Sequence, residues 1–295
     1  MSNFILSCCS TADLTNEHLA SRDISYLPFT YYINDEPYTD DLGQSMSSEE
    51  FYKKMVDGAD TKTSQPNAEK YAEYFSTLLA TGKDVLHLVL SSGISGSYNS
   101  AMIAKEELEG KFPGQKLYIV DSLSASSGTG LIMETLADMR DDGADIDTLR
   151  AWIEEHKLNM HHWFFSTDLT FYIKGGRVSK AAGLFGTILK ICPLLNVDLN
   201  GRLTPREKIR GKAAAAKRAV EMMVQNAEGG LDYNGKCFIS HSNCIEDALN
   251  VKAQIEEKFK NLNGEVLINN IGTTIGSHSG PGTVALFFWG TKRED

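Results

Sequence analysis

The sequence predicts an α/β protein of two domains, and three features of the chain support this prediction. Its 295 residues exceed what one hydrophobic core usually holds. In the first half, short apolar runs alternate with amphipathic helical stretches, a pattern typical of a parallel sheet covered by helices on both faces. The second half combines a hairpin signal with closely spaced strands. We therefore expect an N-terminal three-layer α/β/α domain over residues 1–158 and a C-terminal mixed α/β domain over residues 159–295.

The first half follows the alternating pattern element by element. Ser47 and Glu50 have the spacing of a capping box, and Asn67 and Gly82 are suited to begin and end the next helix. The run DVLHLVL is a largely continuous apolar run of strand length, as expected of a strand that is buried on both faces. The predicted elements are a strand at 3–9, helices at 47–58 and 67–82, a strand at 84–90, a helix at 97–110, a strand at 116–121 and a helix at 128–143.

The second half is predicted to contain antiparallel pieces. Asn200 and Gly201 lie between alternating residues and give a strong hairpin signal. The segment 212–229 is rich in good helix formers and predicts a long helix. The other predicted elements are strands at 161–167, 236–242, 265–272 and 283–290, and a short helix at 183–190.

Composition excludes several classes of protein. No apolar run approaches the ~20 residues of a membrane span, and the first residues lack the basic region of a signal peptide. The five cysteines have neither metal-ligand spacing nor a disulfide framework, so we expect a reducing cytoplasm and no metal site. A net charge of −10 disfavours nucleic-acid binding.

The charge is unevenly distributed along the chain. Residues 169–220 contain eleven basic and two acidic residues, a net charge of +9, so the remainder carries −19. Two interpretations stay open at this point: a solvated helix-and-hairpin face, or a docking surface for a negatively charged partner.

Four polar segments, each containing several Ser or Thr residues and three of them also rich in Gly, are predicted to be loops. They lie at 61–67, 91–101, 120–130 and 272–283. In an open parallel sheet, ligands bind at the carboxyl ends of the strands, and the segment 91–101 follows a predicted strand and precedes a helix, a position that favours an anion. Neither a Walker A sequence nor the dinucleotide fingerprint is present, so we do not expect a nucleotide pyrophosphate.

A serine hydrolase is a rival interpretation of the same loops. The sequence around Ser95 lacks the spacing of a nucleophile elbow, and no carboxylate stands out as the partner of His278. Because the members of a triad need not be adjacent in sequence, this alternative stays open.

Six segments in order resemble the DegV family. They are CSTADL, TSQPN, SSGISGSYNSA, VDSLSASSGTG, FYIKGGRVS and IGSHSGPGTVA, and they extend from residue 9 to residue 285. The resemblance implies the two-domain fold of that family, with a long-chain fatty acid bound in a tunnel. It further implies the fatty-acid-binding subunit of a bacterial fatty acid kinase, which presents the carboxylate to a separate ATP-binding subunit. The product is an acyl phosphate that feeds phospholipid synthesis.

Carried over by motif, the predicted site consists of polar loop residues, with no cofactor other than the fatty acid itself. The expected fatty-acid-binding residues are Thr63, Ser64, Ser95, Gly96, Ser97, Asn99, Ser277 and His278. The residues expected to dock the kinase subunit are Arg177, Arg202, Arg206 and Arg210, which project from the basic segment and its hairpin turn. A lipid sensor or buffer without a kinase partner is a further alternative.

The stretch 181–190 has two interpretations. Its apolar residues recur at i, i+3, i+4 and i+7, which favours a helix with one apolar face, and Lys180 and Lys190 flank it. Such a helix belongs either to the core or to a lid that makes transient contact with a membrane surface.

Overall fold

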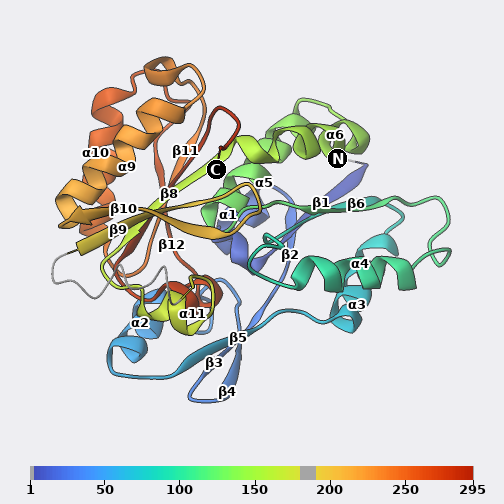
Figure 1. Cartoon of the computed structure of the whole chain (residues 1–295). Helices are drawn as coiled ribbons and strands as arrows, with labels where there is room; N and C mark the ends of the chain where they lie inside the picture. Colours follow the sequence, from blue (N-terminus) through green and yellow to red (C-terminus); the bar gives the residue numbers. More distant parts are fainter. Residues whose placement is uncertain (1–2, 180–190, 295) are drawn as a thin grey trace.

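Three sheets organise the chain in a computed structural model, which describes residues 3–179 and 191–294 (Figure 1). Sheet A is parallel throughout and has the order β2 (Ile24–Leu27), β1 (Phe4–Cys9), β6 (Asp84–Val89) and β7 (Leu117–Asp121). Sheet B is antiparallel and has the order β4 (Glu36–Thr39), β3 (Thr30–Ile33) and β5 (Thr61–Ser64).

Sheet C is mixed, with the β11–β12 pair parallel and its other pairs antiparallel. Its order is β10 (Leu203–Arg210), β9 (Ile191–Val197), β8 (Met160–Ser166), β13 (Thr283–Trp289), β11 (Cys237–His241) and β12 (Leu267–Asn270). The parallel sheet in the first half and the mixed sheet in the second confirm the predicted fold class.

Helices cover the large sheets and one helix lies between them. The described helices are α1 (Asn16–Ser21), α2 (Ser48–Val56), α3 (Ala68–Leu79), α4 (Ser97–Glu107), α5 (Ser127–Asp141), α6 (Ile146–His156), α7 (Thr170–Lys174), α9 (Lys212–Asn226), α10 (Ile245–Lys258) and α11 (Thr273–Ser279). Sheet A packs against α3 and α4 on one face and against α5 and α6 on the other. Sheet C packs against α5 on one face and against α9 and α10 on the other.

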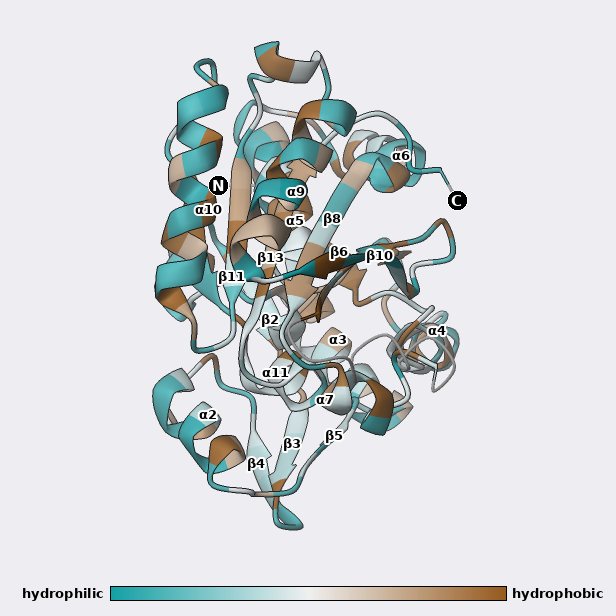
Figure 2. Ribbon diagram, turned by 60° about the vertical axis from the view of Figure 1, so that its left-hand side comes forward, coloured by the Kyte–Doolittle hydropathy of each residue, from teal (hydrophilic) through white to brown (hydrophobic). Residues whose placement is uncertain are grey.

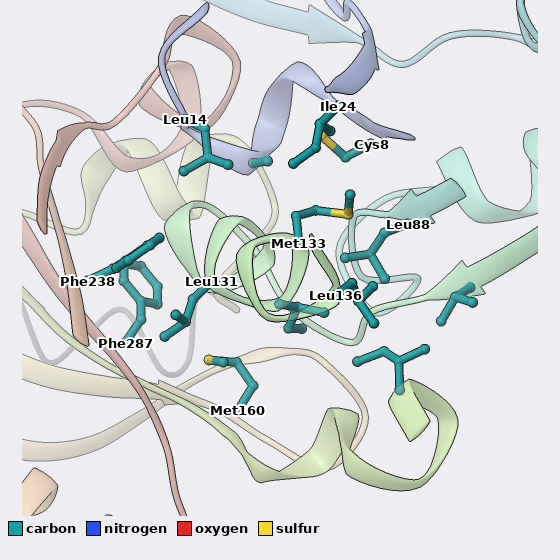
Figure 3. Packing of buried hydrophobic residues seen from close by; sticks show 14 of the residues in the cluster. Cys8, Leu14, Ile24, Leu88, Leu131, Met133, Leu136, Met160, Phe238 and Phe287 are labelled. Atoms are coloured by element: carbon teal, nitrogen blue, oxygen red, sulfur yellow. The ribbon is translucent and has the colours of Figure 1, made fainter. Parts of the chain in front are cut away.

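The helix α5 joins the two large sheets in one core. Figure 3 shows it end-on, with Leu88 of sheet A on one side and Phe238 and Phe287 of sheet C on the other. Leu131 and Leu136 of α5 are fully buried between them. Figure 2 shows that the peripheral α10 is largely teal, with brown residues at intervals along it.

The capping signals and the continuous apolar strand are confirmed. Ser47 accepts a hydrogen bond from the Glu50 N–H at 3.1 Å, and Asn67 accepts one from the Lys70 N–H at 2.9 Å. Along β6, successive side chains alternate between the two cores, because sheet A is covered on both faces. The segment 183–190, predicted to be a helix, and the proposed lid at 181–190 lie outside the described residues.

Two segments predicted to be loops contain regular structure. Residues 61–64 form β5, because the β-branched Thr61 and Thr63 pair with Ile33 and Tyr31 of β3. Residues 273–279 form α11, in which the hydroxyl of Ser277 donates to the carbonyl of residue 273. Serine and threonine favour turns in isolation, and here tertiary pairing and packing against α2, α7 and sheet B override that preference.

The turn of the predicted hairpin is present, but it does not project into solvent as expected. The Ser91 hydroxyl donates to the Gly201 carbonyl at 2.8 Å, and a Cβ on Gly93 would lie 2.3 Å from the Asn200 carbonyl oxygen. Gly201 itself has φ +71°, which glycine adopts without strain. The tip of the β9–β10 hairpin is therefore packed tightly against the loop that follows β6.

Among residues 3–179 and 191–294, no helix is both long enough and apolar enough to cross a bilayer.

Candidate functional site

A cavity of about 310 Å³ lies at the carboxyl edge of sheet A, between that sheet, sheet B and sheet C. Leu90 and Ala125 follow strands of sheet A, Thr63 belongs to sheet B, and Phe164 and Phe287 belong to sheet C. The predicted position at the ends of parallel strands is thus where the cavity occurs. Its volume is at the lower end of the range of about 300–1,000 Å³ that is usual for small-molecule pockets.

Most of the cavity wall is apolar. The hairpin β9–β10 and the neighbouring loops close it with aliphatic and aromatic side chains. The apolar lining residues are Phe29, Leu90, Ile94, Ala125, Phe164, Tyr172, Val197, Leu203, Ile271, Ile275, Ala285 and Phe287. Such a wall favours a ligand with a long apolar portion.

Polar side chains gather where β5 meets α11 and the loop that follows β6. Thr63 Oγ1 and His278 Nε2 are 2.7 Å apart and share a hydrogen bond. The Ser95 hydroxyl donates to Gln65 Oε1 at 3.1 Å, and the Gln65 amide donates in turn to the Ser100 hydroxyl at 3.1 Å. Because β5 carries Thr63 and is followed directly by Gln65, these two hydrogen-bonded pairs are neighbours, and we call Thr63, Ser64, Gln65, Ser95 and His278 the polar end of the cavity.

His278 is held as a neutral imidazole. Burial, and then the nearby positive charge of Arg177, lower the pKa of His278 to about 3. The ring packs directly against the backbone of Gly175, where an added Cβ would lie 2.3 Å from His278 Nδ1. Only glycine at position 175 therefore leaves room for the ring in this position.

Arg177 supplies the positive charge beside the polar end. It lines the cavity, is partly buried, and donates to the Gly175 carbonyl at 2.6 Å, and burial lowers its pKa. Within the described part of the chain, no carboxylate lies at ion-pair distance from its guanidinium. A desolvated cation without an anionic partner is costly, so the site favours one negatively charged group of a ligand.

The polar end adjoins a surface cleft. Gln65, Ile94, Ser95, Arg177 and Leu203 line both the cavity and this cleft. A ligand group bound at the polar end would therefore lie close to the protein surface rather than deep in the core.

The structure brings together half of the residues that were predicted to bind a fatty acid. Thr63, Ser64, Ser95 and His278 line the cavity. The other four lie elsewhere. Ser97 is buried and its hydroxyl is 2.6 Å from the Tyr71 hydroxyl, Gly96 lines the surface cleft, Asn99 is exposed on α4, and Ser277 bonds within α11.

The four arginines predicted to dock a partner also separate into two groups. Arg177 lies at the cavity, as described above. Arg202 lines the surface cleft and is exposed, Arg210 is exposed at the end of β10, and the Arg206 guanidinium donates to Asn196 Oδ1 at 2.8 Å. Both exposed members lie on the β9–β10 hairpin: Arg202 lies at the cleft beside the turn, and Arg210 lies at the opposite end of β10, where it pairs with Ile191.

Two buried carboxyl groups hold the start of α11 and were not predicted as site residues. The Gly272 N–H donates to Asp13 Oδ1 at 3.0 Å, and the Thr274 hydroxyl donates to Asp40 Oδ2 at 2.5 Å. Burial raises the pKa of both carboxyl groups, that of Asp13 to about 8. They fix the helix that carries His278, and the segment CSTADL, which contains Asp13, was the sequence signal for one of them.

Three further residues line the cavity but were not predicted as site residues, although each lies in a segment that the sequence analysis had identified. Gln65 lies within TSQPN and Ser126 within the polar segment 120–130. His162 was read as an ordinary strand residue, yet it lines the cavity and its Nε2 is 2.6 Å from the Ser124 hydroxyl. Among the described residues no group of three or more His, Cys, Asp or Glu side chains is arranged to hold a metal ion.

Comparison with known proteins gives consistent results. Residues 9–291 match the family described as "Uncharacterised protein, DegV family". A DegV domain-containing protein of Clostridium perfringens is 36% identical over 296 aligned positions, which cover 100% of both chains. A Thermotoga maritima structure described as revealing fatty acid binding function shares 26% identity with a TM-score of 0.82, covering 98% of this chain and 100% of its own. The B3 protein of Streptococcus pneumoniae fatty acid kinase, loaded with linoleic acid, shares 20% identity and a TM-score of 0.84, covering 98% of this chain and 99% of its own, a likeness that shows the fold alone.

Proposed function

The chain belongs to the DegV family, and from this premise we propose that it binds one long-chain fatty acid in the cavity and presents the carboxylate for phosphorylation. The tail lies along the apolar wall and the carboxylate lies at the polar end, beside Arg177. The fatty acid binding described for the Thermotoga maritima relative supports the same ligand class here.

The observation that carries this proposal is the contrast between the two parts of the cavity. Burying ~15 methylenes contributes on the order of 12 kcal/mol gross, at ~0.8 kcal/mol per methylene. The cost of burying the carboxylate without hydrogen-bonding or charged partners would offset much of the free energy gained by burying the tail. Arg177, the Ser95 hydroxyl and the Thr63–His278 pair offer it one positive charge and hydrogen-bonding groups, and the neutral His278 adds no second charge. The site therefore suits a single anionic group on a long apolar chain.

The phosphorylation step requires a second protein. The sequence contains no Walker A motif, so ATP is expected to bind to a separate kinase subunit. The polar end adjoins the surface cleft, which gives a phosphoryl donor a short route to the carboxylate. Arg202 is exposed at that cleft and Arg210 is exposed farther along the same hairpin, and both would attract an acidic face of the kinase subunit.

Solvent extraction of the purified protein followed by mass spectrometry tests the binding step. We expect one long-chain fatty acid per chain. After removal of lipid, palmitic acid at ~100 times its dissociation constant should stabilise the fold by ~2.7 kcal/mol, which a melting curve resolves. An extract without stoichiometric fatty acid, together with an unchanged melting temperature, would refute the proposal.

The kinase step is tested by adding ATP, Mg²⁺ and the ATP-binding kinase subunit of the source organism to the palmitate-loaded protein. Acyl phosphate should form and can be captured with hydroxylamine as the hydroxamate. A protein that binds palmitate tightly but yields no hydroxamate with that subunit would instead fit a lipid sensor or buffer.

A further inference from the structure

Ser126 occupies a strained turn between a strand and a helix. It follows β7, precedes α5, and has φ 54° and ψ −148°, a conformation that residues other than glycine rarely adopt. The residues two before and two after it are the small Ser124 and Gly128, and a Cβ on Gly128 would lie 2.4 Å from His162 Nε2. A serine on such a turn, spaced between small residues at the carboxyl edge of a parallel sheet, has the features of a nucleophile elbow.

The Ser126 hydroxyl donates a hydrogen bond to Asp13 Oδ2. Both side chains are buried, with 5% of each exposed, and Ser126 lines the cavity. Burial raises the pKa of Asp13 to about 8 against the hydrogen bonds from Ser126 and Gly272, and the charge of Asp40 adds to that rise. Burial, and then the charge of Asp13, raise the pKa of Tyr52 well above its usual value, so Tyr52 stays neutral beside Asp13. Asp13 is therefore a stronger base than an exposed carboxylate.

The turn also provides a donor for a negatively charged oxygen. The backbone N–H of Ser127 is the first of α5 and accordingly lies among the N–H groups that the helix leaves without a backbone partner. An N–H that directly follows the nucleophile is a usual contributor to an oxyanion hole. The same edge of sheet A thus carries a hydroxyl, a base and an oxyanion donor.

Ser95, another serine that lines the cavity, lacks these features. The Ser95 hydroxyl donates to the Gln65 amide oxygen at 3.1 Å, and an amide does not accept the proton that a nucleophile must lose. Ser95 is therefore suited to bind a head group, whereas Ser126 is suited to react.

We propose that Ser126 and Asp13 form a nucleophile–base pair that hydrolyses an ester or thioester of a long-chain fatty acid held in the cavity. This inference rests on the proposed function for its choice of acyl chain. The released fatty acid would already lie in the cavity from which it is presented for phosphorylation.

The reaction proceeds in two balanced steps. The Ser126 oxygen forms a bond to the acyl carbonyl carbon while its proton passes to the Asp13 carboxylate, and the Ser127 N–H stabilises the oxyanion. The bond to the alcohol or thiol then breaks, and that leaving group takes the proton from Asp13. Water next attacks the Ser126 ester, gives one proton to Asp13, and displaces the serine oxygen, which recovers the proton. The products are a free fatty acid and the alcohol or thiol.

Covalent labelling of the full chain tests this assignment without a mutation. Delipidated protein is treated with a long-chain alkyl fluorophosphonate at pH 8.5, digested with trypsin and mapped by mass spectrometry. Ser126 lies in the peptide 117–140 and Ser95 in the peptide 84–105, so the two candidates separate at once. We expect an adduct on 117–140, located at Ser126 by fragmentation, and we expect added palmitate to slow its formation. No adduct, or an adduct on 84–105, would overturn the proposal.

Turnover of p-nitrophenyl palmitate provides the second readout. The rate should rise as the pH increases through about 8, because Asp13 must be ionised to accept the proton. Asp13→Asn should lower the rate roughly 100-fold and remove this pH dependence, and Ser126→Ala should abolish labelling. Wild-type protein that binds palmitate but neither labels nor turns over would overturn the nucleophile while leaving the proposed carrier function intact. Protein that labels at Ser126 but binds no palmitate would refute the carrier function instead.

Discussion

Gly175→Ala should disrupt the polar end of the cavity although it replaces none of the residues of that end. The added Cβ would lie 2.3 Å from His278 Nδ1 and 3.2 Å from the Phe171 carbonyl oxygen. Carbon and nitrogen atoms rest at about 3.5 Å or more, so the ring must move by roughly 1 Å. The 2.7 Å contact between His278 Nε2 and Thr63 Oγ1 does not survive such a displacement.

The expected magnitude follows from the lost hydrogen bond. A buried donor or acceptor left without a partner costs ~1–3 kcal/mol. If the whole cost reduces the free energy of fatty acid binding, the Kd for fatty acid rises about 5- to 150-fold, since ~1.4 kcal/mol corresponds to a tenfold change in Kd. Isothermal titration with palmitic acid measures the change, and a melting curve of the lipid-free protein records any separate loss of stability.

The neighbouring Gly176 offers a matched control. A Cβ there meets no atom of the described residues within 4 Å, although its φ of +72° makes any substitution slightly strained. Gly176→Ala should therefore lower stability modestly and leave palmitate affinity within about twofold of the wild type. Equal affinity for wild type and Gly175→Ala would refute the view that the position of His278 matters for binding.

Three further predictions concern docking of the kinase subunit, the contact between α5 and sheet C, and the dependence of stability on pH. Replacing Arg202 and Arg210 with alanine should raise the apparent KM of the kinase subunit for the loaded protein, most strongly at low salt, with unchanged lipid content; loss of lipid would indicate misfolding instead. Lys236→Met should lower the free energy of unfolding in urea by about 1–3 kcal/mol, because Lys236, directly before β11 of sheet C, donates from Nζ to Glu134 of α5 at 2.7 Å. An unchanged midpoint of urea unfolding would contradict this prediction. Burial lowers the pKa of His87 to about 3, so the fold holds this side chain neutral, and the fold loses stability as the pH falls below 6.5, where the unfolded chain takes up the proton. The free energy of unfolding should fall by up to ~2 kcal/mol between pH 6.5 and 5, and His87→Gln should make it less dependent on pH in this range.

The strand and helix patterns could be predicted from the sequence where a local signal matched the final environment. The run 84–90 is mainly apolar because α5 covers one face of β6 and α3 and α4 cover the other. Ser47 and Asn67 cap their helices because their side chains reach N–H groups three residues ahead. These signals depend on neighbours in the chain, and short sequence windows contain them.

The elements that were not predicted depend on contacts between distant segments. β5 and α11 consist mainly of Thr, Ser and Gly, whose local preferences favour turns, and they become regular by packing on each other. α5 belongs to the first half of the chain, yet it is buried between sheet A and sheet C. Dividing the sequence at residue 158 assigns α5 to the first domain alone and does not predict its contact with sheet C.

In the candidate site too, sequence motifs identified single residues, whereas the contacts between distant residues could not be predicted. Motifs identified Thr63, Ser95 and His278, but the pairing of Thr63 with His278 spans 215 positions and arises only in the fold. Arg177 was assigned to docking from its charge, and its place at the cavity depends on the turn at Gly175. The relation between Asp13 and Ser126 was likewise invisible, because 113 positions separate them.

The central claim is that one fatty acid carboxylate binds at the polar end of the cavity. The most direct measurement is the ¹³C NMR spectrum of delipidated protein titrated with palmitic acid labelled at the carboxyl carbon. We predict a single bound resonance that saturates at one equivalent, shifts in Thr63→Val, and disappears on displacement by unlabelled palmitate. A spectrum that contains only the resonance of unbound palmitate, or a bound resonance that Thr63→Val leaves unchanged, would contradict the account.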